Sequence, residues 1–265
     1  MTGEIPYLGD LIQLNYFYLY NNQLSGNVPS WFNNLVNLTE LYLGSNNLTG
    51  QIPDLSLPQL VELGLSVNQL SGNFPSLSGC SNLQELFISY NQLEGELPSG
   101  LGTLSNLKYL FLNDNRFTGT LPQEIGNLDN LEELYLSGNK LTGLLPSGIT
   151  GMSDPNLSIN IHWNGLYTND SYIKNFVDSH HSMVWLNNQW ANWTYTQTVA
   201  PTNISAGDTD HDSVTISWDP ILYQAETGGY RVYSTTTTGT NYTLAGTTTD
   251  KSANQLTVTG LEPST

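Results

Sequence analysis

Leucines recur through the first 166 residues in one short pattern, Leu-x-x-Leu-x-Leu-x-x-Asn-x-Leu-x-Gly-x-Ile-Pro, with conservative replacements. Within one copy, Leu41 and Leu43 alternate with Glu40 and Tyr42, and this period of two predicts a strand with one buried face. Units of about 22 to 25 residues bury that face by stacking on their neighbours, which predicts a solenoid with a parallel sheet on its concave face. The asparagines of the seven copies are Asn22, Asn46, Asn68, Asn91, Asn115, Asn139 and, in a less regular last copy, Asn164.

The second half of each copy predicts a turn. Asn46 follows its strand, where an amide side chain can satisfy backbone groups that the turn leaves unpaired. Gly50 permits a backbone conformation that is closed to other residues, and Pro53 fixes the bend beyond it. The same pair recurs as Gly26/Pro29, Gly72/Pro75, Gly95/Pro98, Gly119/Pro122 and Gly143/Pro146.

The Leu-x-Gly-x-Ile-Pro half resembles the plant-specific subtype of leucine-rich repeats, which also occurs in bacterial secreted proteins. The resemblance covers residues 1–166. It implies a second short strand in the Gly-x-Ile-Pro segment, and recognition of proteins, peptides or glycans through the concave sheet. The opening Met1-Thr2-Gly3-Glu4-Ile5-Pro6 reads as the tail of a repeat. We therefore expect an incomplete first repeat, and a chain that is a fragment or the product of a truncated gene rather than a complete protein.

The repeat pattern stops after Leu166. Residues 170–178 place apolar side chains at i, i+1, i+4 and i+5, which predicts a short amphipathic helix with Asn169 or Asp170 as its N-cap. Trp185, Trp190 and Trp193 follow. A solenoid must cover the apolar core of its last turn, so we interpret 167–195 as a C-terminal cap and 167–198 as cap plus linker. The alternative is that the tryptophans form a sugar-binding platform.

Residues 199–265 have the alternation of a second, all-β domain. Strands are predicted at 213–218, 230–233 and 256–263. The order Pro201, Trp218, Tyr230-x-Val-Tyr and Leu261-x-Pro-x-Thr resembles a fibronectin type III domain. The last two strands of that family would lie beyond Thr265, so the resemblance implies a truncated, incomplete immunoglobulin-like sandwich. We expect it to be the weakest folding unit, because its missing strands would leave apolar area and sheet edges open.

Composition narrows the classes of partner. Only 11% of the residues are charged and the net charge is −17, against about a quarter charged in ordinary globular domains. The six basic residues are scattered, which argues against nucleic acid or an anionic membrane surface as partner. No apolar run reaches the roughly 18 residues of a membrane span. These features are typical of an extracellular, secreted or cell-surface protein, whose signal peptide we expect to have been lost with the missing N-terminus.

Candidate chemistry is sparse. The order and spacing of a Ser/His/Asp triad, a phosphate-binding glycine loop and a zinc site are not found, so we predict no catalytic residues, no metal and no cofactor. The acidic loop at 208–212 lacks the glycine of a calcium loop, and His180 and His181 have no acid or cysteine beside them in the sequence. We interpret both as solvated. Cys80 occupies a position where other copies carry leucine, which predicts a small apolar core residue.

The exposed strand positions predict the binding surface. Between the two strand leucines, the copies form an aromatic row: Tyr18, Tyr42, Gly64, Phe87, Phe111, Tyr135 and Asn160. Two residues earlier they form a carboxylate row: Tyr16, Glu40, Glu62, Glu85, Tyr109, Glu133 and Ser158. Aromatic residues favour strands and stack across them, so these rows could serve the sheet alone. We predict that all of them except Gly64, Asn160 and Ser158 line a ligand-binding surface, and that the gap at Gly64 admits a ligand group.

Three functions remain open at this point. The favoured one is non-catalytic recognition of a protein or peptide partner, with a glycan as a further possibility. The alternatives are a carbohydrate-binding accessory region of a larger secreted hydrolase, which would use the same aromatics as sugar platforms, and the sensor ectodomain of a receptor.

Overall fold

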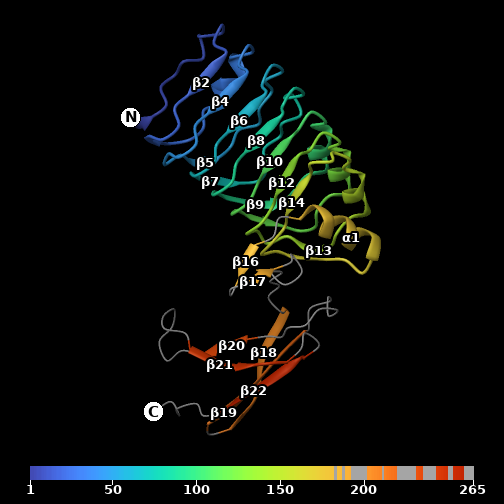
Figure 1. Ribbon diagram of the computed structural model, residues 1–265. Helices are drawn as coiled ribbons and strands as arrows, with labels where there is room; N and C mark the ends of the chain where they lie inside the picture. The colour runs from blue at the N-terminus through green and yellow to red at the C-terminus, as the bar shows by residue number, and fades with distance from the viewer. Residues whose placement is uncertain are drawn as a thin grey trace. The chain divides into compact units, whose positions relative to one another are not determined.

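The computed structural model describes residues 1–181, 184–186, 189–191, 202–210, 212–219, 231–234, 243–249 and 253–259. The chain divides into two compact units, Met1–Thr198 and Val199–Thr265, which are described separately (Figure 1). The first contains the repeats and the second contains strands only, among its described residues.

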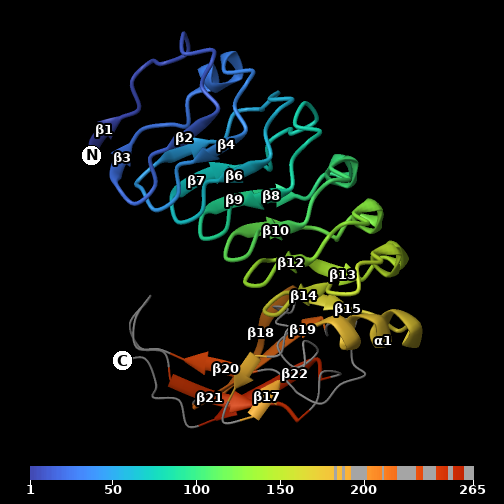
Figure 2. The same ribbon diagram turned by 45° about the horizontal axis from the view of Figure 1, so that its top comes forward.

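Seven parallel strands, one from each asparagine-containing repeat, form a single sheet along the first unit (Figures 1 and 2). Each strand is three residues long, and its middle residue is buried while its flanking residues belong to the aromatic and carboxylate rows. The predicted parallel sheet is confirmed. The strands are β2 (Tyr16–Tyr18), β4 (Glu40–Tyr42), β6 (Glu62–Gly64), β8 (Glu85–Phe87), β10 (Tyr109–Phe111), β12 (Glu133–Tyr135) and β14 (Ser158–Asn160).

A second set of short parallel strands lies after the asparagines, as the resemblance implied, and each strand that precedes an Ile-Pro or Leu-Pro pair ends before it. Gly50 in β5 has a φ of 74°, a conformation that disfavours a side chain. The strands are β1 (Thr2–Glu4), β3 (Gln23–Ser25), β5 (Thr49–Gln51), β7 (Gln69–Gly72), β9 (Gln92–Glu96), β11 (Arg116–Thr118), β13 (Thr142–Leu144) and β15 (Gly165–Tyr167). They pair as β1-β3, β5-β7-β9-β11 and β13-β15.

Short 3-10 helices close four of the repeats: η1 (Ser30–Asn34), η2 (Ser99–Thr103), η3 (Gln123–Asn127) and η4 (Ser147–Gly151). The described chain has no such helix between Asn46 and Asn91. The reason is length. Six residues lie between Pro53 and Leu60, the leucine that precedes strand β6, whereas eight lie between Pro98 and the equivalent Leu107, and the shorter connection has no room for a helical turn.

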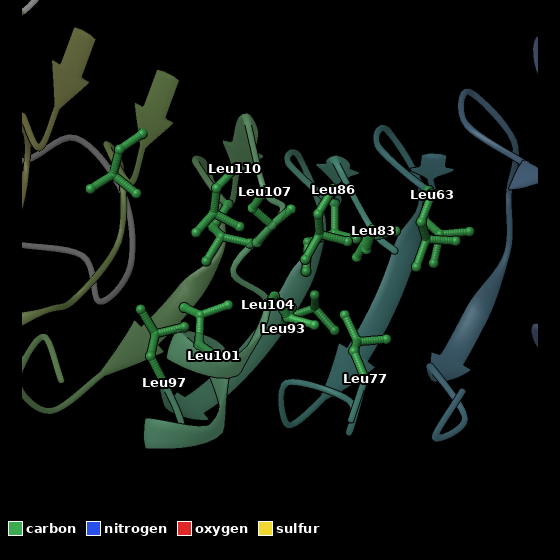
Figure 3. Packing of buried hydrophobic residues seen from close by; sticks show 14 of the residues in the cluster. Leu63, Leu77, Leu83, Leu86, Leu93, Leu97, Leu101, Leu104, Leu107 and Leu110 are labelled. Carbon is green, nitrogen blue, oxygen red and sulfur yellow. The ribbon is translucent and has the colours of Figure 1, made fainter. Parts of the chain in front are cut away.

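One continuous core runs through the stacked repeats. Leu41, Leu63, Leu86, Leu110 and Leu134 are all fully buried in it, which confirms that the strand leucines share one core. Figure 3 shows Leu63, Leu86 and Leu110 entering this core from successive strands, with Leu83 and Leu107 beside them. Cys80 is also fully buried, as expected, and burial raises the pKa of its thiol.

The asparagines hold successive repeats together. The Asn115 side-chain oxygen accepts a hydrogen bond from the Leu93 amide at 3.0 Å, one repeat back. Its amide nitrogen donates to the carbonyls of Ile88 at 3.0 Å and Leu112 at 3.1 Å. Equivalent bonds are made by Asn46, Asn68, Asn91, Asn139 and Asn164. Backbone groups that the turns leave unpaired are thus satisfied, as the pattern predicted.

Helix α1 (Ser171–His180) follows the last repeat, within two residues of the predicted bounds. The Asp170 carboxylate caps it by accepting from the amides of Tyr172 at 2.7 Å and Ile173 at 3.4 Å. Ile173 and Val177 join the repeat core, so the helix covers it after the last turn. Strands β16 (Val184–Leu186) and β17 (Gln189–Ala191) then pair antiparallel. The predicted packing of the three tryptophans lies outside the described residues.

The second unit contains an antiparallel sheet of β18 (Thr202–Asp210), β19 (Ser213–Asp219) and β22 (Gln255–Thr259), and a separate pair of β20 (Arg231–Ser234) and β21 (Thr243–Thr247). Three of these coincide with the strands predicted from sequence, while β18 and β21 were missed. Trp218 is buried, and its indole N–H donates to the Ala253 carbonyl at 2.8 Å. Tyr230 and residues 260–265, which carried part of the resemblance, lie outside the described residues.

Candidate ligand-binding surface

The register of the seven-stranded sheet assembles both predicted rows. Tyr18, Tyr42, Gly64, Phe87, Phe111, Tyr135 and Asn160 are paired in this order on successive strands. Tyr16, Glu40, Glu62, Glu85, Tyr109, Glu133 and Ser158 are paired in the same way. Neighbouring members therefore lie about 4.8 Å apart along the sheet. The side chains of both rows are exposed or half-buried, apart from Gly64.

The first half of the surface, on strands β2 to β6, is built from tyrosines and glutamates; we call it the tyrosine half. The ring of Tyr42 lies 5.7 Å from that of Tyr18 and 6.4 Å from that of Tyr20, both edge-on. The Tyr18 hydroxyl donates to the Glu40 carboxylate. The Tyr42 hydroxyl donates to the Glu62 carboxylate at 2.6 Å. Each tyrosine thus reaches across to the carboxylate of the next repeat.

These contacts change how the tyrosines ionise. The hydrogen bond to Glu40 raises the pKa of Tyr18 to about 12, because a phenolate would lose that bond and face a carboxylate. The pKa of Tyr42 is raised further, first by burial and then by its bond to Glu62. Both tyrosines are therefore fixed hydrogen-bond donors at neutral pH.

The second half of the surface, on strands β8 to β12, is an aromatic stack; we call it the stacked half. The rings of Phe87 and Phe111 lie 5.0 Å apart and are tilted by 60°. The rings of Phe111 and Tyr135 lie 4.6 Å apart and are nearly parallel, at 5°. Each stacked ring covers a face of its neighbour, and such pairs contribute about 0.5–1.5 kcal/mol beyond their burial.

Gly64 separates the two halves. A Cβ at this position would lie 2.3 Å from the Cδ1 atom of Tyr42, so the Tyr42 ring leans over strand β6. The open gap expected from the sequence is therefore partly filled by Tyr42. What remains is a groove of about 680 Å³, which we call the Gly64 groove. Its lining includes Tyr18, Tyr20, Glu40, Tyr42, Glu62, Gly64, Val67, Phe87 and Phe111.

Carboxylates line one side of this surface. Glu40, Glu62 and Glu85 stand side by side on β4, β6 and β8. The pKa of Glu85 is raised by burial and then by the charges of Glu62 and Glu40, and it is lowered by Lys108. Lys108 lies 3.6 Å from Glu132. The row therefore carries a surplus of negative charge.

The structure adds residues that the two rows missed. Tyr20 lies two positions after Tyr18 and contacts both Tyr18 and Tyr42; the alternation of Tyr16, Tyr18 and Tyr20 was a usable signal. Glu132 accepts from the Tyr109 hydroxyl at 2.7 Å. Glu132 lies one position before the carboxylate row, so the row spacing does not include it.

The described residues do not suggest a reactive centre. They contain no group of three or more His, Cys, Asp or Glu side chains that could hold a metal ion. His180 and His181 were expected to be solvated, but both are half-buried. Their rings bond to the carbonyls of Phe176 and Asp178, both at 2.8 Å. Asp208 and Asp210 fall at the end of strand β18, and His211 lies outside the described residues. Among the described residues, no helix is long and apolar enough to cross a membrane.

Comparison with known families agrees with this architecture. Residues 12–57 match leucine-rich repeats (two copies), residues 81–141 match leucine-rich repeats again, and residues 199–265 match the fibronectin type III domain. The chain carries leucine-rich repeats followed by a fibronectin type III domain. No curated protein sequence matches it.

Similar solved structures are leucine-rich-repeat proteins. The ectodomain of the Arabidopsis thaliana receptor kinase GASSHO1/SCHENGEN3, in complex with CASPARIAN STRIP INTEGRITY FACTOR 2, has a TM-score of 0.59 and 31% identity over 62% of this chain and 20% of its own. The Arabidopsis HAESA ectodomain, in complex with an IDA peptide hormone, has a TM-score of 0.53 and 32% identity, over 62% of this chain and 32% of its own. A Leptospira interrogans leucine-rich-repeat protein has a TM-score of 0.52 and 33% identity, over 64% of this chain and 42% of its own. This chain thus spans less than half the length of each.

Proposed function

We propose that the chain is a non-catalytic recognition module that binds a protein or peptide outside the cell, along the concave face. The observation that carries this proposal is the Gly64 groove, which lies between two groups of half-exposed aromatic side chains. Aromatic residues held rigidly in contact with one another offer large contact area at small entropic cost, which is why they dominate binding hot spots.

The comparisons support a peptide ligand. The GASSHO1/SCHENGEN3 and HAESA ectodomains are solved in complex with CASPARIAN STRIP INTEGRITY FACTOR 2 and with a peptide hormone, respectively. An extended peptide also suits the geometry, because the exposed rows run across successive strands and so present a long, narrow track. The same surface would serve the sensor ectodomain of a receptor.

The stacked half disfavours the carbohydrate alternative. A sugar ring needs the free face of an aromatic ring to stack on, but Phe111 and Tyr135 are nearly parallel at 4.6 Å and cover one face of each other. Phe87 covers Phe111 further, with its ring centre 5.0 Å away. Phe111 therefore has little free face for a sugar ring, and its exposed edges suit the apolar side chains of a peptide better.

Selection from a displayed library of random twelve-residue peptides tests the proposal. Peptides that bind should be enriched on the intact chain and not on a Phe111→Ala/Tyr135→Ala variant that remains folded by circular dichroism. Hydrogen exchange should then show protection by a selected peptide on strands β4 to β12. Absence of any enrichment, or protection confined to other strands, would contradict the proposal.

A further inference from the structure

We infer that the Gly64 groove is a subsite for one arginine side chain of the bound peptide. The inference deepens the proposed function and rests on it. It specifies the chemistry of the side chain that anchors the peptide between the tyrosine half and the stacked half.

The walls of the groove suit a flat group. Tyr42 bounds it on one side, and Phe87 and Phe111 bound it on the other. Tyr42 and Phe87 lie on strands two positions apart, roughly 10 Å at the backbone, and the lean of Tyr42 over Gly64 narrows this space. A planar group in contact with a ring occupies about 3.5–4 Å. The space left beside Phe87 therefore admits a planar group more readily than a branched one.

The charge on the groove selects a cation. Glu40 and Glu62 line the groove, and Glu85 stands beside Glu62 on the neighbouring strand β8. Tyr42 and Tyr18 donate to Glu62 and Glu40 and leave lone pairs free on both. Glu85 accepts no hydrogen bond from any described side chain. Among the described residues, Lys108 is the one cation that lowers the pKa of Glu85. A cation entering the groove would therefore gain two or three carboxylate neighbours.

Arginine combines both requirements. Its guanidinium is planar, stacks on aromatic faces and presents a fork of N–H donors that matches carboxylate oxygens. Lysine offers a compact, strongly hydrated charge that stacks less well. An uncharged planar group would stack but would leave the carboxylates without a counter-charge. The groove is thus better matched to arginine than to either alternative.

The rim of the groove adds an apolar contact. Val67 lines the groove, is 49% exposed and has a φ of 60°. The matching position is left-handed in every repeat, at Asn21, Ser45, Tyr90, Asp114, Gly138 and Trp163, so this φ belongs to the repeat turn. Val67 is the one β-branched residue among them, and its exposed side chain is placed to contact the aliphatic stem of the arginine.

The first experiment asks whether the anchor is arginine. The probe is a twelve-residue peptide selected from the random library on the intact chain, and its affinity is measured by fluorescence anisotropy. Replacing its arginine with citrulline, which keeps the planar shape and removes the charge, should weaken binding about tenfold or more, the range seen when close charge pairs are broken. Replacement with lysine should weaken it severalfold. Selected peptides without arginine, or equal affinity after either replacement, would overturn the inference.

The second experiment locates the arginine. Glu62→Gln with Glu85→Gln removes one charge from the groove and one beside it. Glu94→Gln with Glu96→Gln removes two exposed charges from strand β9, outside the seven-stranded sheet. Both variants change net charge equally, so general attraction is matched. The citrulline replacement should lose most of its effect in the first variant and keep it in the second, which is the signature of a direct pair in a double-mutant cycle.

The outcomes separate the inference from the proposed function. Failure to select any peptide contradicts the proposed function itself. A peptide that binds the concave face but shows equal citrulline effects in both charge variants leaves the proposed function standing and overturns the arginine subsite. Coupling confined to Glu62 and Glu85 supports it.

Discussion

The tyrosine half and the stacked half of the concave face stand on the same frame but are held by different forces. Tyr18 and Tyr42 are fixed by hydrogen bonds to carboxylates one repeat away. Phe87, Phe111 and Tyr135 are fixed by contact with one another. Each half carries two glutamates of the carboxylate row, Glu40 and Glu62 in the first and Glu85 and Glu133 in the second. In the first half they accept hydrogen bonds from the tyrosines, whereas in the second the aromatic rings pack on one another. A ligand that spans both would meet hydroxyl–carboxylate pairs in one half and packed rings in the other.

The difference arises from side chains and not from the backbone. All seven strands are three residues long and pair in unbroken register. The break between the halves comes from one position, Gly64, because no side chain there separates Tyr42 from the groove. A regular solenoid thus gives two kinds of surface through substitutions at two exposed positions per repeat.

The largest effect should come from the common frame. Asn46 lies beneath the tyrosine half and Asn115 beneath the stacked half, and both are buried with several hydrogen bonds. Either change to alanine leaves a buried amide N–H and carbonyls unpaired, so we expect each to cost about 3 kcal/mol of unfolding free energy. Urea denaturation measures this. The exposed Asn130, which bonds to one carbonyl, is the control. Unequal costs for the two asparagines would show that the halves differ in frame as well as in surface.

The next largest effect should be a loss of peptide affinity when the aromatic residues of the stacked half are truncated. Phe111 lies at the centre of the stack, so Phe111→Ala and Tyr135→Ala should each weaken binding of the library-selected peptide by about 1–2 kcal/mol. Higher salt should weaken it too, because the carboxylate row attracts the basic partner over a screened distance. Tyr172→Ala, which removes a 69% exposed aromatic from helix α1, is the control. Unchanged affinity in both stack variants would mean that the stack serves the sheet alone.

The rows themselves were predictable from sequence, and their side-chain arrangement was not. Strand alternation and repeat length place Tyr42 beside Gly64 and Gly64 beside Phe87, because both follow from backbone geometry. The lean of Tyr42 and its bond to Glu62 depend on rotamers that respond to the missing Gly64 side chain. Val67 and its strained φ lie in a turn, where the pattern that located the strands no longer applies.

Similar reasoning applies to the rest of the fold. Helix α1 was predicted because its apolar spacing and its Asp170 cap are both local signals. The absence of 3-10 helices from described residues 46–91 follows from the shorter connection between Pro53 and Leu60. The repeat pattern alone does not predict it, because the pattern fixes the strand and turn residues and not the length of the connection that follows. Strand β18 (Thr202–Asp210) was missed because its pairing with β19 contains two irregularities, which interrupt simple alternation.

Removing single hydroxyl groups should sharpen the comparison further. Tyr42→Phe removes the donor to the half-buried Glu62, and we expect a loss of about 1 kcal/mol in unfolding free energy. Tyr18→Phe acts at the exposed edge and should have less effect at neutral pH. Because the folded pKa of Tyr18 is raised to about 12, its contribution is present below the ordinary tyrosine value of about 10 and is lost as pH rises through 12. If the unfolding free energy of Tyr18→Phe falls between pH 10 and 12 as steeply as that of the unsubstituted chain, this role is contradicted.

Relief of backbone strain at Val67 should stabilise the protein. Val67→Asn places a residue that tolerates left-handed φ at a position now held at 60°, and we expect a gain of about 1 kcal/mol. The matching change in the stacked half, Asp114→Asn, starts from a residue that already tolerates its φ of 54° and should gain little. Thermal unfolding of the two variants provides the measurement. If Val67→Asn stabilises and also weakens peptide binding, the strained valine is retained for contact with the ligand; a destabilised variant would refute the strain.

The smallest effect concerns the charge at the boundary of the two halves. Glu85 faces Glu62 and Glu40 from a partly buried position, and its pKa is raised by burial first and by those charges second. A group whose pKa is raised on folding favours the folded state below its unfolded pKa, and this preference is lost as pH rises through the folded value. The Glu85 carboxylate therefore costs stability at pH 7, and Glu85→Gln should raise the unfolding free energy by about 0.5 kcal/mol there, the size of a like-charge pair across strands. The gain should vanish as the solution is acidified below pH 4, where Glu85 itself is protonated. Glu96→Gln, an exposed change in strand β9, should show no such pH dependence, and a gain of equal size from that control would assign the effect to net charge instead of to the carboxylate row.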